Sequence, residues 1–140
     1  MGEIEQSDNT DNGLRQQAWY GLAFWMAAGL LLEGLMAFRS PVYLQDPVRR
    51  ELFRLAHAHG TLLNIVMLIA GLYMAKGLIA PPTMALWSLR AGVIAMPLGF
   101  LLGGIWHYES DPGMGVFLAP IGGILVILGV VAICLSNYRK

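Results

Sequence analysis

The sequence predicts an all-α integral membrane protein, folded as an antiparallel four-helix bundle. Hydrophobic residues make up 56% of the 140 residues and charged residues only 13%, which is more apolar than a soluble domain of this size usually is. A spanning helix needs about 20 apolar residues to cross a hydrocarbon core about 30 Å thick. The sequence offers such stretches at residues 17–38, 47–79, 84–107 and 113–136. Because the connections are short, we expect neighbouring helices to be antiparallel and to form one domain, residues 17–138.

The N-terminal segment, residues 1–16, is polar and acidic. It lacks the basic residues, short apolar stretch and small-residue cleavage site of a signal peptide, so we expect a disordered tail. The first helix, residues 17–38, begins with Trp19 and Tyr20, aromatic residues that are typical of a membrane interface. Its one acidic residue is Glu33.

The second helix, residues 47–79, begins at Asp46-Pro47, the pattern of an N-cap followed by proline at the first helical position. The segment 80–83, which contains two prolines, should end it. The charged residues of its first turns should lie in the headgroup layer of the bilayer. They are Arg49, Arg50, Glu51 and Arg54.

The third helix, residues 84–107, contains Pro97, for which we predict a kink. Small residues recur along it every four positions and would let another helix approach closely. They are Ala91, Ala95, Gly99 and Gly103. The fourth helix, residues 113–136, follows a short turn that contains Pro112.

The charge distribution gives no reason to expect a nucleic-acid partner, because nine basic residues balance nine acidic ones. The single cysteine, Cys134, excludes an internal disulfide. Five basic residues fall on the side of the termini and four on the other, which favours cytoplasmic termini, here in a bacterial inner membrane. The two sets are Arg15, Lys76, Arg90, Arg139 and Lys140 against Arg39, Arg49, Arg50 and Arg54.

Polar residues should collect at one end of the bundle. The end of the first helix, the start of the second, the end of the third and the start of the fourth share one side of the membrane. The residues of these ends are His57, His59, His107, Glu33, Glu109 and Asp111. We expect the three histidines at similar depth, with Asn64 one to two turns deeper. Ionisable groups in spanning helices are costly and usually mark a site, so we predict the functional site at this end.

The second helix carries a polar stripe that should face protein. At 100° per residue, His57, Thr61 and Asn64 lie within about 40° of one another, and His59 lies about 160° from His57. The two histidines should therefore have different neighbours and should not share one metal. Structural roles are open for each residue, such as interfacial hydrogen bonds for the histidines, a pair of Glu33 with an arginine, and an interhelical bond for Asn64.

The histidines are compatible with several cofactors. Three histidines and a carboxylate can hold zinc, copper or non-haem iron, but the sequence has neither the paired carboxylates of di-iron bundles nor an HExxH motif. A haem needs only one axial histidine with small residues such as Gly60 beside it. We therefore favour haem. The polar stripe of the second helix favours His57 as its ligand, because this side chain should face protein.

The segment Arg54-Leu-Ala-His-Ala-His-Gly-Thr-Leu-Leu-Asn64 resembles the second helix of the styrene oxide isomerases, which are small four-helix membrane proteins. An Ala-x-Ala-His element is followed shortly by asparagine, and the fourth helix opens with Leu118-Ala119-Pro120. The chain is also similar in general appearance to the hydroxylaminobenzene mutases. The resemblance implies a homotrimer that binds haem b and an axial histidine at His59.

The resemblance also implies a reaction. Ferric iron would act as a Lewis acid on the oxygen of a small apolar epoxide that enters from the lipid bilayer, and a 1,2-hydride shift would give an aldehyde. Arg54, Gly60 and Thr61 would flank the cofactor. Asn64 or Tyr108 would hydrogen-bond the developing charge, and His107 lies beside Tyr108.

The composition is equally compatible with a role that involves no catalysis. A small chain of four plain spanning helices suits a haem-carrying or accessory subunit of a larger membrane complex of the respiratory type. A transporter or channel is disfavoured, because its path needs polar groups at the midplane and the predicted polar groups lie at one end.

Overall fold

The computed structural model describes the backbone of residues 2–137 and the side chains of residues 12–136. The helices are α1 (Gly2–Ala37), α2 (Pro41–Leu44), α3 (Pro47–Ala75), α4 (Thr83–Ile105) and α5 (Leu118–Asn137), and the 3-10 helix η1 (Met114–Phe117) precedes α5. Residues 2–137 contain no β-strand. The all-α prediction is confirmed.

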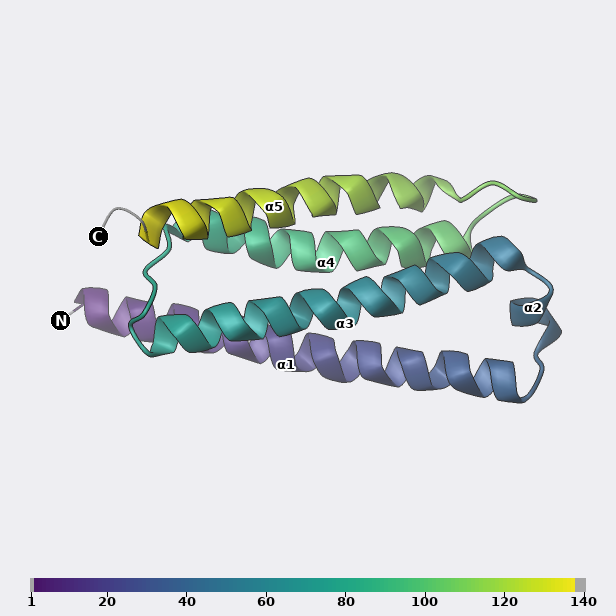
Figure 1. Ribbon diagram of the computed structural model, residues 1–140, viewed down its shortest axis with the longest axis horizontal. Coiled ribbons are helices and arrows are strands. Elements are labelled where there is room, and N and C mark those ends of the chain that lie inside the picture. The colour runs from purple at the N-terminus through teal and green to yellow at the C-terminus, as the bar shows by residue number, and fades with distance from the viewer. Residues whose placement is uncertain (1, 138–140) are drawn as a thin grey trace.

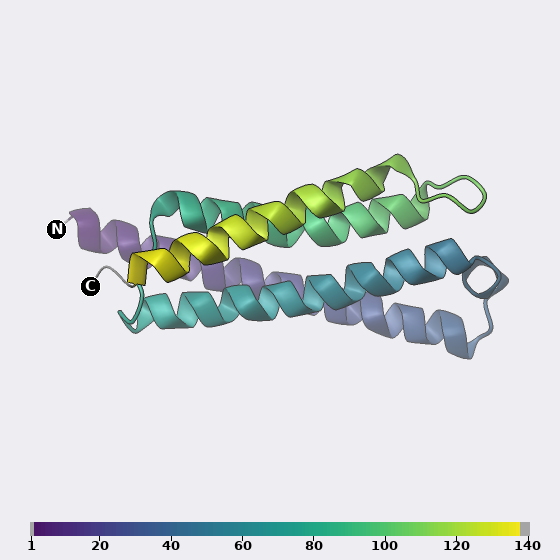
Figure 2. The same cartoon turned by 45° about the horizontal axis from the view of Figure 1, so that its top comes forward.

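Four helical segments are long and apolar enough to cross a bilayer, so this is a membrane protein. They are Asn12–Ala37, Pro47–Ala75, Thr83–Ile105 and Met114–Ser136. The helices run side by side, and both termini lie at the same end of the bundle (Figures 1 and 2). The main contacts join α1 to α3, α3 to α4 and α4 to α5, so each long helix packs mainly on its neighbour in sequence.

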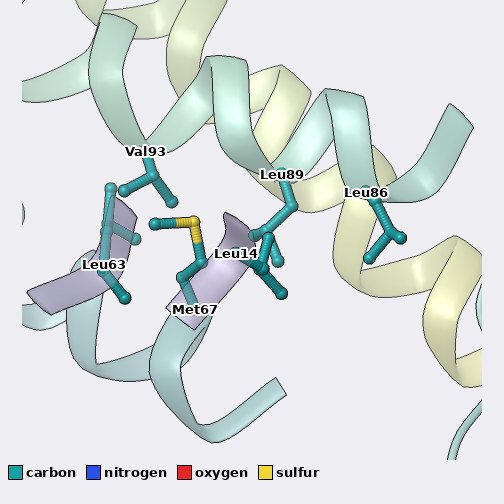
Figure 3. Packing of buried hydrophobic residues seen from close by; sticks show 7 residues of the cluster. Leu14, Leu63, Met67, Leu86, Leu89 and Val93 are labelled. Atoms are coloured by element: carbon teal, nitrogen blue, oxygen red, sulfur yellow. The ribbon is translucent and has the colours of Figure 1, made fainter. Parts of the chain in front are cut away.

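The first helix begins earlier than the predicted residue 17, because α1 starts at Gly2 and its backbone includes residues 2–16, for which we expected a tail. The cause is burial of apolar side chains that stand in helical register with the rest of α1. Leu14 and Ala18 are fully buried members of the core cluster. Leu14 lies beside Met67 of α3 and Leu89 of α4 (Figure 3). Burial of this stripe stabilises the helix before residue 17. Residue 1 lies outside the described residues.

The start of α3 is as predicted, and its end is not. The side chain of Asp46 accepts a hydrogen bond from the backbone N–H of Arg49 at 2.9 Å, as an N-cap does. The helix ends at Ala75 rather than 79, because Gly77 adopts a φ of 66°. The N–H of Leu78 then bonds to the carbonyl of Tyr73 at 3.0 Å. Glycine tolerates this left-handed conformation without penalty, so a Schellman motif ends the helix before the prolines.

The other boundaries differ from the prediction by a turn or less. Helix α4 ends at Ile105, so His107 follows the helix instead of ending it. The predicted fourth helix, residues 113–136, divides into η1 and α5. The short helix α2 lies in a segment for which we predicted only a connection.

Helices α4 and α5 approach backbone to backbone through glycine. A Cβ atom added to Gly99 would lie 2.3 Å from the backbone nitrogen of Ala119, and one added to Gly122 would lie 2.3 Å from the backbone nitrogen of Met96. Carbon atoms normally pack about 3.5 to 4.0 Å apart, so no side chain fits at either position. The predicted close approach is confirmed for Gly99, whereas Ala91 is exposed.

Candidate functional site

The three histidines do not form one cluster. His57 and His59 lie about 15 and 18 Å beyond the first residue of α3, at a rise of about 1.5 Å per residue. His107 instead contacts Asp46 at the start of that helix. The predicted similar depth is therefore wrong, because α3 begins well before the level of the two histidines. Among the described residues, no group of three or more His, Cys, Asp or Glu residues is placed to hold a metal ion.

His57 connects α3 to α1. Its Nδ1 lies 2.7 Å from the carbonyl oxygen of Trp25. A carbonyl oxygen can only accept, so Nδ1 carries the proton that this hydrogen bond needs. The ring lies against Gly29, where an added Cβ would be 2.3 Å from the ring atom Cε1. The imidazole of His57 thus fits a space that only glycine leaves open.

His59 faces the opposite neighbour, α4. Its Nδ1 donates to the carbonyl oxygen of Leu55, one turn earlier, at 2.8 Å. Its ring centroid lies 5.1 Å from that of Phe100 in α4. The prediction that the two histidines have different neighbours is confirmed. No ligand can bind both rings of one chain from one side of α3.

His107 belongs to a polar cluster at the end of the bundle away from the termini. Its Nε2 lies 2.8 Å from Oδ2 of Asp46, and its Nδ1 is buried without a hydrogen-bond partner among the described residues. Arg49 donates from Nε to the carbonyl oxygen of Gly104 at 3.1 Å. These contacts join the start of α3 to the end of α4. They give His107 and Asp46 a structural role.

Asp46 is the titratable group that this cluster perturbs. Burial raises the pKa of its carboxyl group, but the hydrogen bond from the Arg49 N–H and the charges and hydrogen bond of His107 and Arg49 lower it by more. The net effect is a pKa below the usual value. The ionised carboxylate is therefore the form that the fold stabilises.

The other predicted site residues are dispersed. Tyr108 is 80% exposed in the loop after α4, whereas Asn64 lies about 26 Å along α3 from Pro47, so the structure does not bring them together. Arg54 is exposed and pairs with Glu51 at 3.6 Å. Among the described residues, Glu33 forms no ion pair with an arginine.

Gly60 and Thr61 lie in the middle of α3. A Cβ added to Gly60 would lie 2.3 Å from Cδ2 of Trp25, so Gly60 is a packing position for α1. The hydroxyl of Thr61 is buried without a hydrogen-bond partner among the described residues. Asn64 lies against Gly21, where an added Cβ would be 2.1 Å from its Oδ1. The predicted stripe of His57, Thr61 and Asn64 thus faces protein, and its two outer members lie against glycines of α1.

A groove between α1 and α4 is a candidate binding site. Its volume is about 720 Å³, which lies within the range of about 300 to 1,000 Å³ that is usual for ligand sites. Most of its wall is aromatic or aliphatic. These residues are Tyr20, Phe24, Trp25, Val93, Ile94 and Leu98.

Four polar side chains line the groove, Gln16, Gln17, Asn64 and Arg90, and two of them connect its walls. Arg90 of α4 donates from Nε to Oε1 of Gln17 in α1 at 2.6 Å, and Nε2 of Gln17 donates to the carbonyl oxygen of Arg90 at 3.3 Å. The guanidinium also lies 5.0 Å from the ring centroid of Trp87. Asn64 is only 3% exposed and donates from Nδ2 to the carbonyl oxygen of Gly60 at 2.7 Å.

Sequence reasoning identified Asn64 but missed Gln17 and Arg90. We counted Arg90 only as a charge that sets membrane orientation. Its position within the third predicted span, about 10 Å past the first residue of α4, is the signal that could have revealed it. Gln17 carries no comparable signal, because its pairing with Arg90 depends on how α1 and α4 are rotated toward each other.

No protein-family model matches the chain, and comparisons with curated proteins and with solved structures find no match. The resemblance to the styrene oxide isomerases therefore stays a prediction.

Proposed function

We propose that this membrane protein binds a small, largely apolar molecule that enters the groove between α1 and α4 from the bilayer. The observation that supports the proposal is the groove itself, a volume of about 720 Å³ with aromatic and aliphatic walls. Both walls belong to spanning segments. A molecule dissolved in the bilayer would reach the groove without crossing water.

The polar side chains of the groove support a binding role over simple contact with lipid. A charged residue in a spanning helix is costly unless a partner or ligand compensates it, and Arg90 lies about 10 Å past the first residue of α4. By contrast, the outward face of α5 is aliphatic, with residues such as Ile121, Ile124 and Ile127. The groove is therefore a place where the membrane surface of this protein offers both apolar contact and hydrogen bonds.

Photolabelling tests this proposal. The purified protein in lipid nanodiscs is treated with an apolar probe that carries a diazirine, and labelled peptides are identified by mass spectrometry. We expect saturable labelling of groove residues such as Phe24. Labelling of Ile124, on the outward face of α5, should rise with probe concentration without saturation. Equal and unsaturable labelling at both places would contradict the proposal.

A pair of variants sharpens this experiment. Ile94 lines the groove and is 48% exposed, whereas Ile124 is 58% exposed on α5. Ile94→Trp should fill part of the groove and reduce labelling of Phe24. Ile124→Trp makes the same chemical change outside the groove and should leave labelling of Phe24 unchanged.

The second candidate function is binding of haem b, and a specific observation favours it. His57 and His59 both direct Nδ1 to a backbone carbonyl oxygen, so Nε2 is the ring nitrogen of each that could ligate iron. Nε2 of His57 packs against Gly29, where an added Cβ would lie 2.8 Å away, so ligation there would require α1 to move. Iron-ligating histidines usually donate their other ring N–H in this way. His59 therefore suits axial ligation with less rearrangement than His57, and when bound the iron would supply a Lewis acid for an isomerase or a redox centre for a subunit of a larger complex.

An ultraviolet-visible spectrum of the purified protein tests this candidate. A Soret band that is lost in only one of His57→Ala and His59→Ala would identify the axial ligand. A low-spin spectrum with two histidine ligands would favour a subunit that transfers electrons, and an open sixth position would favour an isomerase. No Soret band after haem supplementation would refute haem binding. It would leave the groove proposal standing, because no histidine is among the described residues that line the groove.

Oligomeric state and location are further proposals. We propose a homotrimer, on the resemblance alone. Light scattering of the protein purified in detergent measures the mass of the complex. We also propose a bacterial inner membrane with cytoplasmic termini. Protease accessibility of an N-terminal tag in inside-out vesicles tests this orientation.

A further inference from the structure

We infer that the ligand of the groove is a single-chain amphiphile with an acidic head, a carboxylate or a phosphate monoester, bound at Arg90. The inference rests on the proposed binding function of the groove and specifies its ligand. It depends on the charge of Arg90, on the contacts that orient its guanidinium, and on the order of polar and apolar residues along the groove.

The charge of Arg90 has no counter-ion among the described residues. The ion pairs of residues 12–136 involve Arg49, Arg54 and His107, and none involves Arg90. Arginine stays protonated in proteins. The described residues that line the groove include no carboxylate. An acidic head would place a negative charge beside Arg90, whereas a cationic head would be repelled.

Gln17 orients the guanidinium for such a head. Its Oε1 accepts from Nε of Arg90 at 2.6 Å, and Trp87 lies against the guanidinium with its ring centroid 5.0 Å away. These two contacts use Nε and one face of the planar group. The terminal nitrogens Nη1 and Nη2 are left to donate to two oxygens, which is the geometry that carboxylates and phosphates accept from arginine.

The order of residues along the groove gives the ligand its direction. Gln17 is hydrogen-bonded to Arg90. Phe24 and Trp25 lie about 10 to 12 Å further along α1, toward the middle of the membrane. Leu98 lies about 12 Å beyond Arg90 on α4. The head would therefore bind near the end of the bundle that holds the termini, and the apolar chain would extend inward over the aromatic side chains.

Quenching of tryptophan fluorescence tests the inference. The probes are dodecanoic acid, dodecyl phosphate and dodecanol, each with a terminal bromine atom that quenches nearby tryptophan. They are titrated into the protein in zwitterionic nanodiscs at about pH 8, well above the pKa of ~4 that is typical of a carboxyl group. The contribution of Trp25 is the part of the quenching that disappears in Trp25→Phe.

We expect saturable quenching of Trp25 by both acids at concentrations about tenfold or more below that needed for the alcohol, because charge-assisted hydrogen bonds to arginine add that much affinity. Arg90→Gln should remove the preference for acids, and Arg90→Lys should keep part of it. Arg54→Gln, which removes an exposed cation outside the groove, should change nothing. Unchanged quenching in nanodiscs of anionic phospholipid would support a free single-chain acid as the ligand. Weaker quenching there would show that a double-chain phospholipid competes for the groove and would contradict the single-chain assignment.

Two results would overturn the inference in distinguishable ways. Equal quenching by acid and alcohol that Arg90→Gln does not alter would refute the acidic head and leave the groove as a binding site. No saturable quenching of Trp25 by any probe would refute the groove as well.

Discussion

Gly60 provides the sharpest test of how α1 packs on α3. A Cβ at this position would lie 2.3 Å from Cδ2 of Trp25 and 2.4 Å from both Cε2 and Cγ. Carbon atoms pack about 3.5 to 4.0 Å apart, so Gly60→Ala requires the ring and the helix to separate by about 1 Å or more. The ring has little freedom to move, because Trp25 is only 5% exposed and its own carbonyl accepts from His57.

Overpacking of this kind costs about 1 to 3 kcal/mol. The matched control is Gly34→Ala in α1, because nothing lies within 4 Å of a Cβ at Gly34. Both variants gain the helix propensity of alanine, about 1 kcal/mol in water. This gain cancels in the comparison, so Gly60→Ala should be less stable than Gly34→Ala by about 1 to 3 kcal/mol.

Unfolding by sodium dodecyl sulfate in mixed micelles, followed by tryptophan fluorescence and by circular dichroism, measures this difference. Both variants should keep their helical content before the transition. Equal stability of Gly60→Ala and Gly34→Ala would refute the packing of Trp25 on Gly60, and with it the placement of His57 and Asn64 against α1.

Three further predictions concern single residues. Asp46→Ala removes an N-cap and should cost about 1 kcal/mol at neutral pH, measured by the same unfolding assay. Folding lowers the pKa of Asp46, so its stabilising effect should be complete above the unfolded pKa of ~3.9. The effect should be lost as the pH falls through the folded pKa, so the stabilities of wild type and Asp46→Ala should converge in acid. His57→Ala should destabilise the packing of α1 on α3 by roughly 0.6 to 1.7 kcal/mol, the values measured for interhelical hydrogen bonds in membranes. His59→Ala should cost less, because its hydrogen bond lies within α3. A larger cost for His59→Ala would contradict the hydrogen bond of His57 to α1. Gly77→Ala places a side chain at a φ of 66° and should cost about 1 kcal/mol, seen as earlier fraying of α3 by hydrogen exchange; unchanged exchange of Leu78 would argue against the Schellman motif.

The number of spanning helices and the N-cap of α3 could be predicted because each depends on local sequence. Length and apolar composition identify a span, and Asp46-Pro47 identifies a helix start. The start of the first helix was predicted too late because we gave the polarity of residues 1–16 more weight than the helical spacing of their apolar residues. Leu14 stands four residues before Ala18 and is buried with it, so the helical register of apolar residues already extended before residue 17.

The depth of polar residues and the groove could not be predicted in the same way. The order of helices places His57 and His107 on one side of the membrane, but depth depends on how far α3 extends beyond its apolar part. The groove depends on the rotation of α1 against α4, which brings Gln17 to Arg90. No local pattern encodes that rotation, because neighbouring faces of both helices are apolar.

The most direct test of the central claim is competition at the groove. Wild-type protein in nanodiscs is photolabelled with the apolar diazirine probe while dodecanoate is added. Binding in the groove predicts that dodecanoate suppresses labelling of Phe24 and leaves labelling of Ile124 unchanged. In Arg90→Gln the same suppression should need about tenfold or more dodecanoate. Suppression that is equal at Phe24 and Ile124, or that persists unchanged in Arg90→Gln, would contradict binding of an acidic amphiphile between α1 and α4.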